Sequence, residues 1–375
     1  MKDNQIEGLK RELGFWDVAI NAINISYLTL MLLLTSSCSI KYYKEKDFGI
    51  VRKIDAHIHV RILNDSIAQQ AAIDNFQFIN VNVNHTDSTL QLQKKYTKYQ
   101  VETHPKQIMW VDAFSMKNWD SPNWTQETIE MLKESFDKGA LGIKIWKNIG
   151  MSVKDVNGQL IMIDNPRFDS VMLYIINQNK TVMGHLGEPR NCWLPIEQMT
   201  VNNDREYFKK WPQFHMYLHP EMPSYEAHIN ARDRFLARHP DMRFVGAHLG
   251  SLEYDVDSLA KRLNRFPNMA VDIADRLGHL QFQSQKNYNK IRNFILKYQD
   301  RIIYGTDLVL WESGVQAKAK ERFHKRWLDE WRYLTNDTQM TSEQVKGEFK
   351  GLNLPQKVID KIYYKNAVHW FGIKN

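Results

Sequence analysis

Several features that mark large classes of protein are scarce in this sequence. Its 50 Lys and Arg residues are scattered among 43 Asp and Glu residues and form no basic stripe, so nucleic acid is not an expected partner. It has only two cysteines, Cys38 and Cys192, whose contexts differ and do not indicate a disulfide. Prolines are few, no tract has low complexity and 43% of the residues are hydrophobic, which together indicate a globular chain.

The N-terminal region carries an apolar run over residues 25–34, followed by Thr35-Ser36-Ser37-Cys38. This run is too short to span a bilayer, which needs about 20 apolar residues, but it suits the hydrophobic region of a signal peptide. The cysteine after small residues resembles a bacterial lipobox, in which that cysteine is lipidated after cleavage. We therefore predict a lipoprotein signal peptide over residues 1–38, ending at a lipidated Cys38, and a tether over residues 39–50. The protein would be exported and anchored by lipid in the periplasm or at the cell surface; the alternative is an amphipathic helix lying on the globular domain.

Residues 51–375 show the alternation of short apolar runs and helical patterns that is typical of βα units and a parallel sheet. Eight candidate strands fit this rhythm, near residues 54–60, 76–83, 108–113, 142–146, 181–186, 243–249, 269–273 and 301–307. Helices are expected between most of them, at residues 126–138, 165–178, 225–238, 252–265 and 286–298, with a closing helix at 354–373. Eight strands is the number that a closed barrel requires, so we predict a single-domain (β/α)8 barrel of the α/β class.

Residues 188–224, after the fifth strand, do not fit the minimal barrel. This segment is long, rich in Trp, Pro and His, and has no clear period. Long loops of this kind are uncommon unless they are functional, and in a barrel this one would follow the end of a strand where active sites are built.

Two histidines, His57 and His59, lie at the end of the first candidate strand in Asp55-Ala56-His57-Ile58-His59. Alternate residues of a strand share a face, so both imidazoles are expected to point into the barrel as half of a divalent metal site. Three further metal-capable residues end three further candidate strands: His185, His248 and Asp307. Independent core residues would not be expected at the same end of strand after strand.

These residues resemble the pattern of the amidohydrolase superfamily, and within it the amidohydrolase-related branch that also contains decarboxylases. The segments Arg238-His239-Pro240, Gly246-Ala247-His248-Leu249-Gly250 and Asn366-Ala367-Val368 are similar to that branch as well. The resemblance covers the chain from about Ile54 to its end.

The resemblance implies a role for each of these residues. His57, His59, His185 and Asp307 would bind a divalent metal, and Asp307 would also take the proton of the attacking water and pass it to the leaving group. His248 would ligate a second metal or polarise the substrate carbonyl. Zinc is the expected metal, with manganese or iron as alternatives and one or two ions per chain.

Lys144, in Gly142-Ile143-Lys144-Ile145-Trp146, is expected on the inward face of the fourth strand. A lysine inside a barrel is costly unless it is paired or modified. In the superfamily a lysine on this strand can be carboxylated and bridge two metals. The alternatives are a free ammonium that binds a substrate carboxylate, and an outward side chain like that of Lys147.

Other residues near the predicted strand ends would either contact the substrate or have ordinary structural roles. Arg190 and Glu188 would reach the pocket mouth, where a guanidinium suits an anionic substrate, or would be ordinary loop residues. Trp146, Trp193 and Trp311 would form an aromatic wall or simply pack. Asp272 is expected to point inward behind the metal ligands, and Cys192 has no paired base that would make it a nucleophile.

The sequence thus leaves three functions open. The first is a metal-dependent hydrolase in which Asp307 acts as general base and a C–N or C–O bond of a small amide, lactone or ester is cleaved. The second is a metal-dependent decarboxylase or hydratase of the same branch. The third is a barrel that has lost catalysis and serves as a binding protein on the cell surface. The expected partner is a small-molecule substrate, anionic or aromatic.

Overall fold

The computed structural model describes residues 40–312 and 318–374. The predicted signal peptide, Cys38 included, lies outside the described residues. Within these two ranges, none of the helices combines the length and apolarity that crossing a membrane requires.

One compact unit spans Tyr42–Asn375 and so includes part of the predicted tether, while the predicted domain start at residue 51 stays a prediction. Tyr42 forms a β-bridge with Pro355, and Phe48 is buried in the main hydrophobic core, with its ring 5.9 Å from that of Trp331. Residues 42–48 of the predicted tether therefore pack on the domain, with Phe48 buried and Tyr43 partly buried 5.6 Å from the ring of Trp331.

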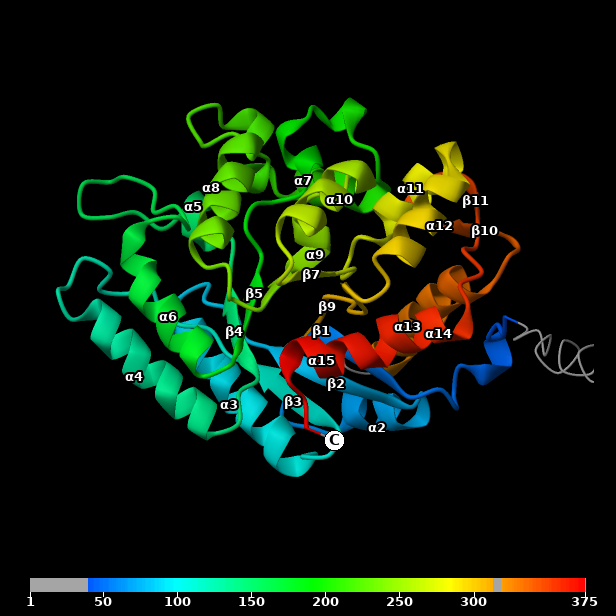
Figure 1. The fold of residues 1–375 in the computed structure, drawn as a ribbon, viewed down its shortest axis with the longest axis horizontal. Coiled ribbons are helices and arrows are strands. Elements are labelled where there is room, and N and C mark those ends of the chain that lie inside the picture. The colour runs from blue at the N-terminus through cyan, green and yellow to red at the C-terminus, as the bar shows by residue number, and fades with distance from the viewer. Residues whose placement is uncertain (1–39, 313–317, 375) are drawn as a thin grey trace, which may run out of the picture. The chain divides into compact units, whose positions relative to one another are not determined.

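Parallel strands form two larger sheets in the described part of the chain (Figure 1). The first has the order β3-β2-β1-β9 and the second the order β4-β5-β6-β7-β8. Their bounds are β1 Lys53–Arg61, β2 Phe76–Val81, β3 Ile108–Val111, β9 Leu308–Trp311, β4 Gly142–Ile145, β5 Thr181–Gly184, β6 Phe244–Gly246, β7 Met269–Asp272 and β8 Ile302–Ile303.

Backbone contacts join the two sheets at both edges. Beside β3, Asp112 forms a parallel bridge with Ile143 of β4. Just after β8, Tyr304 accepts a hydrogen bond from the N–H of Ala56 in β1 (3.0 Å). The expected α/β architecture is therefore confirmed, while closure of all strands into one sheet stays a prediction.

Helices follow most strands and cover the outside of the sheets, as Figure 1 shows for α3, α4 and α6. Their bounds are α2 Ser66–Ile73, α3 Asp87–Thr103, α4 Trp124–Asp137, α5 Asn148–Met151, α6 Asp169–Asn177, α7 Asn202–Lys210, α8 Tyr225–Arg238, α9 Ala247–Gly250, α10 Val256–Arg265, α11 Leu277–Lys286, α12 Tyr288–Lys297, α13 Ala319–Thr335, α14 Gln356–Asp360 and α15 Asn366–Phe371.

Two hydrophobic clusters lie on the two sides of the strands. The larger one fills the space between strands and helices. The smaller one joins inward residues of the strands, such as Ile54 and Val245, to Trp370 and Phe371 of α15. The predicted closing helix is confirmed in outline, although a π-helical turn, Lys361–Lys365, separates α14 from α15.

Three features differ from the sequence prediction. Asp307 does not end a strand, since β8 stops at Ile303 and β9 begins at Leu308. A hairpin of β10 (Gln339–Ser342) and β11 (Val345–Lys350) was not predicted. The segment 188–224 contains α7 and four short 3-10 helices, Arg190–Trp193, Ile196–Gln198, Pro212–Phe214 and Met216–Leu218, and is thus more ordered than its lack of period suggests.

Candidate metal centre

The paired histidines lie on β1, where alternation directs both side chains to one face. His57 is fully buried and His59 is 5% exposed. Beside them the chain turns sharply between β8 and β9, with Asp307 at φ 59°, a left-handed conformation that Asp tolerates better than most residues. The N–H of Asp307 donates to the carbonyl of His57 (2.7 Å), which fixes the carboxylate next to the histidines.

A glycine makes this close approach possible. A Cβ added to Gly305 would lie 2.8 Å from the Cβ of His57, closer than side chains pack. The turn is also tied by Asp55, whose carboxylate accepts from the N–H (3.1 Å) and the hydroxyl (2.6 Å) of Thr306 and from the N–H of His57 (3.2 Å). Asp55 therefore links β1 to the segment that carries Asp307, a role that the sequence reasoning did not assign to it.

His248 follows β6 in a strained turn. Its φ is 60°, and Leu249 (56°) and Ser251 (55°) are left-handed as well. Such strain persists only where surrounding contacts impose it and is concentrated at functional sites. Here the N–H of His248 donates to Oδ1 of Asp272 (2.7 Å), which holds the turn against β7.

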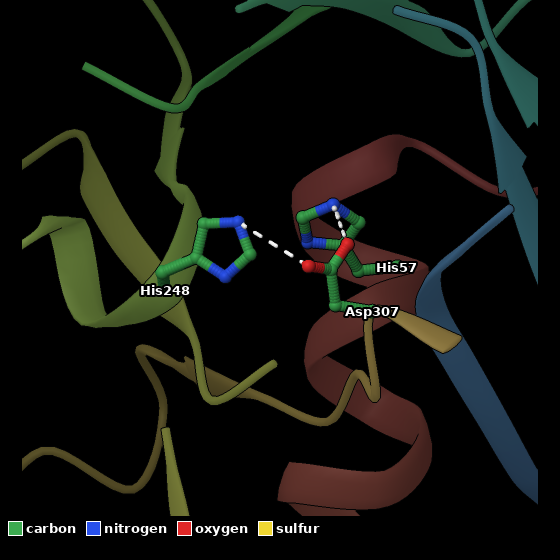
Figure 2. Close-up of side chains that lie close together, drawn as sticks. All are labelled: His57, His248 and Asp307. Carbon is green, nitrogen blue, oxygen red and sulfur yellow. Dashed lines mark ion pairs between the residues drawn. The ribbon is translucent and has the colours of Figure 1, made fainter. Parts of the chain in front are cut away.

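Asp307 lies between imidazoles from different parts of the sheet. Figure 2 shows His57 and His248 turned toward its carboxylate from two sides. The Nε2 atoms of His59, His57 and His248 lie 3.0, 3.4 and 3.9 Å from the Asp307 oxygens. Ligand atoms of His57, His248 and Asp307 all fall within 4.8 Å of one another, a spacing that suits a single metal ion.

The opposite nitrogen of each imidazole has a hydrogen-bond partner that fixes the tautomer. Nδ1 of His59 lies 2.6 Å from the carbonyl oxygen of Val81, and Nδ1 of His248 lies 2.9 Å from that of Ala274. A carbonyl only accepts, so both Nδ1 atoms donate. Nδ1 of His57 donates to the Asp272 carboxylate (2.9 Å). In the neutral form of each ring the lone pair is then on Nε2, the atom on the side of Asp307, as in histidines that bind metals.

Burial controls the charges of the centre. It lowers the pKa of His59 to about 4 and the pKa values of His185 and His248 well below that of a free imidazole. Burial alone would raise the pKa of Asp307, but the surrounding imidazoles of His248, His57 and His59 hold it well below its usual range. At neutral pH the imidazoles of His59, His185 and His248 are therefore neutral beside an ionised Asp307 carboxylate, the state in which these groups bind a divalent cation.

His185 and Lys144 complete the cluster from β5 and β4. The ring of His185 lies 4.3 Å from that of His248, and its buried Nε2 has no hydrogen-bond partner within the described residues. Lys144 points inward, because its Nζ lies 3.1 Å from Nε2 of His57, and this rules out the outward alternative. Burial lowers the pKa of Lys144 to about 8, although Asp272 and Asp307 act in the opposite direction.

The donor set of these residues fits a divalent metal. Four histidines and a carboxylate converge from β1 and from the segments that follow β5, β6 and β8. The buried Nε2 of His185 makes no hydrogen bond and lies 3.7 Å from Oε2 of Glu188, so it is available as a further ligand. The ligand atoms of His57, His248 and Asp307 are close enough to hold one ion, and His59, His185 and Lys144 line the cavity beside them. The predicted ligand set of His57, His59, His185 and Asp307 stays a prediction.

A cavity of about 430 Å³ opens onto this cluster. Two of the predicted aromatic residues, Trp146 and Trp311, line this cavity. It is also lined by residues that were not predicted from the sequence: Arg61, His85, Lys147, Tyr207 and Phe214. Arg61 continues the alternation His57-x-His59-x-Arg61, a signal that would have revealed it. Tyr207 and Phe214 belong to the segment 188–224, which therefore contributes to the cavity wall.

Three candidates lie elsewhere. The guanidinium of Arg190 lies 4.6 Å over the ring of Tyr254, outside the cavity lining, so its predicted contact with substrate is not supported. Trp193 donates to the carbonyl of Pro223 and packs at 5.7 Å from His228. Cys192 is buried, and burial raises the pKa of its thiol, consistent with its not being a nucleophile. Glu188, by contrast, is buried in an ion pair with the cavity residue Lys147.

Comparison with known structures supports the fold. The chain is similar to 2,6-dihydroxybenzoate decarboxylase from Rhizobium, with a TM-score of 0.51 and 13% identity over 86% of this chain and 98% of that one. The structure of 2,6-dihydroxybenzoate decarboxylase complexed with 2,6-dihydroxybenzoate gives the same values. The 4-oxalomesaconate hydratase from Rhodopseudomonas palustris has a TM-score of 0.47 and 8% identity over 85% of this chain and 95% of that one.

At such identities the likeness concerns the fold alone. No curated protein matches the sequence. The family described as amidohydrolase matches residues 213–373, the part of the chain that carries His248 and Asp307. The resemblance that the sequence motifs predict, to the amidohydrolase family, is thereby confirmed.

Proposed function

We propose that this protein is a metal-dependent hydrolase that cleaves a C–N or C–O bond in a small amide, lactone or ester. The observation that carries the proposal is the convergence of the Asp307 carboxylate with the Nε2 atoms of imidazoles whose Nδ1 atoms are already used as hydrogen-bond donors. A divalent metal held there would supply a water with a pKa near 7, activated for attack at neutral pH.

The residues of the chain then have distinct tasks. Asp307 accepts the proton of the attacking water on its carboxylate, which is ionised and already aligned by the N–H bond to His57, and passes it to the leaving group. His248, with its Nε2 facing the cavity, polarises the substrate carbonyl or ligates a second ion.

Lys144 keeps two possible tasks in this proposal. A pKa near 8 leaves part of the amine neutral, which is the form that reacts with carbon dioxide to give a bridging carbamate. A protonated Lys144 would instead bind a carboxylate of the substrate. Two metals per chain support the first task and one supports the second.

A decarboxylase or hydratase is the second candidate. It is favoured by the combination of aromatic walls, Trp146 and Trp311, with the cations Arg61 and Lys144 in one cavity, a lining that suits a small aromatic anion. The similar decarboxylase has been crystallised with 2,6-dihydroxybenzoate, a molecule of this kind.

The test compares the wild type with Asp307→Asn on panels of esters, lactones and amides and of aromatic carboxylates. Hydrolysis without release of carbon dioxide supports the hydrolase, and carbon dioxide release from the acids supports the decarboxylase. Asp307→Asn is expected to retain part of its metal and to lose turnover. Equal performance of both proteins in every assay would instead indicate a binding protein without catalysis.

We also propose that the protein is an exported lipoprotein, on the basis of the apolar run before Cys38. Metabolic labelling with radioactive palmitate tests this directly. The wild type is expected to take up label in the membrane fraction and Cys38→Ser is not; an unlabelled wild type would overturn the proposal.

A further inference from the structure

Arg61 is the last residue of β1 and lines the cavity two residues beyond His59. Its side chain is buried, with 7% of the residue exposed. Its Cα partner on β9 is Trp311, and the guanidinium lies 4.0 Å from the centre of the Trp311 ring. The indole therefore supports one face of the guanidinium and holds it in a fixed orientation.

Arg61 forms no ion pair at contact distance among residues 40–312 and 318–374, and the carboxylate of Asp307 acts on its charge only from farther away. The nearby carboxylate of Asp307 pairs with His57 and His59 instead. The Nε of Arg61 has no hydrogen-bond partner in the described part of the chain. The 3.5 Å approach of its Nη2 to Nδ1 of His59 joins two donors, because that Nδ1 donates to Val81.

The other cations of the cavity differ in this respect. Lys147 is neutralised by an ion pair with Glu188, and Lys144 lies within the metal cluster against His57. A buried guanidinium without an anion is costly, since desolvation of a charge is repaid only by a partner. Arg61 is thus a fixed cation in the cavity wall that is suited to bind an anion.

The position of Arg61 sets the distance between this anion and Asp307. The Cα atoms of His59 and Arg61 are about 6.6 Å apart along the strand, and Nη2 of Arg61 lies 3.5 Å from Nδ1 of His59, whereas Nε2 of His59 faces Asp307. The imidazole of His59 therefore lies between the guanidinium and Asp307, so a carboxylate bound to Arg61 is separated from Asp307 by roughly the width of one ring. Trp311, which is 39% exposed, and Trp146 flank that space. A flat molecule with a carboxylate at one end fits between these walls.

We propose that Arg61, supported by Trp311, is the carboxylate-binding residue of this site and that it selects small ring-bearing carboxylates whose reacting bond lies about one ring away from the carboxylate. The placing of the reacting bond rests on the proposed function, whereas the binding of the carboxylate by Arg61 does not. A planar carboxylate accepts two parallel N–H bonds from a guanidinium, a geometry that the ammonium of a lysine cannot supply.

The test is calorimetric titration with benzoate and with benzamide, a neutral molecule of the same shape. The wild type is expected to bind benzoate about 10- to 100-fold more tightly, the usual contribution of hydrogen bonds to a charged group. Arg61→Met is expected to abolish that preference, and Arg61→Lys to recover only part of it. Arg190→Met is the matched control, since it removes an arginine that stacks on Tyr254 outside the cavity, and it should keep the full preference.

Two outcomes would overturn the proposal. One is an undiminished preference for benzoate in Arg61→Met with the metal content of the wild type. The other is loss of the preference in wild-type protein once a chelator has removed the metal, because the carboxylate would then be held by the ion. Loss of preference in Arg61→Met supports the proposal even if no hydrolysis is ever detected, so the failure of the proposed function would be seen separately.

Discussion

Asp272 offers the sharpest perturbation of the metal centre that leaves every candidate ligand in place. Its Oδ2 accepts from Nδ1 of His57 (2.9 Å), while Oδ1 accepts from the N–H groups of His248 (2.7 Å) and Ala274 (3.1 Å). Both oxygens are thus fully used as acceptors. Asp272→Asn replaces one of them with an NH2 group, which can only donate.

Either orientation of the new amide disturbs the centre. If its NH2 faces His57, the imidazole must carry its proton on Nε2 and loses the lone pair that would bind the metal. If its NH2 faces the backbone, the strained turn of His248 loses its acceptor. Loss of a hydrogen bond behind a metal-binding histidine weakens metal affinity about 10- to 100-fold, or about 1.4–2.8 kcal/mol.

Competition with a chromogenic chelator measures the metal affinity, and kcat/KM is measured on the same samples. Asp74→Asn is the control, because Asp74 is also buried but pairs with His324 of α13, and neither residue lines the cavity. If Asp272→Asn has the metal affinity and the kcat/KM of the wild type, the hydrogen bonds of Asp272 do not position His57 and His248 for metal binding, and the argument is refuted.

Three further predictions concern other parts of the molecule. Lys147→Met leaves the buried Glu188 without its ion-pair partner and is expected to lower the free energy of unfolding, measured by urea denaturation, by about 3–5 kcal/mol. The double variant Glu188→Gln/Lys147→Met should recover part of this loss. An unchanged denaturation midpoint in Lys147→Met would contradict the ion pair. Cys192, whose thiol pKa burial raises, is expected to resist iodoacetamide in the native protein and to react once unfolded, as read from its tryptic peptide; rapid native labelling would show that it is accessible. Burial lowers the pKa of Lys53 from 10.5 to about 7 in the folded protein. Between these two pH values Lys53 is protonated in the unfolded chain but neutral in the folded one, so its contribution to the free energy of unfolding rises with pH. The free energy of unfolding of the wild type relative to Lys53→Met should therefore increase from pH 7 to pH 10, and a flat difference would contradict the shift.

The metal cluster was predictable because a few geometric rules determine it. Alternation along one strand puts His57 and His59 on one face, and parallel strands bring their carboxyl ends to the same edge, where His185 also lies. The same rules correctly placed Lys144 and Asp272 inside. They would have placed Arg61 there too, had the alternation been followed one step farther.

The remaining features depend on contacts that have no sequence signature. The acceptors for Nδ1 of His59 and His248 are backbone carbonyls, which every residue possesses. The side chain of Arg190 stacks on Tyr254, more than 60 positions away in the chain, and therefore lies outside the cavity. Likewise, Phe48 is buried against Trp331 of α13, so a stretch that reads as a polar tether is part of the core.

The proposed metal site is best tested by the metal content per chain, measured by elemental analysis of protein purified without chelators. We expect at least one divalent ion per chain in the wild type, two if Lys144 is carboxylated, and loss of the ion in a His57→Ala/His59→Ala variant that still folds. Wild-type protein that contains no metal, and that neither binds nor is activated by added zinc or manganese, would contradict it.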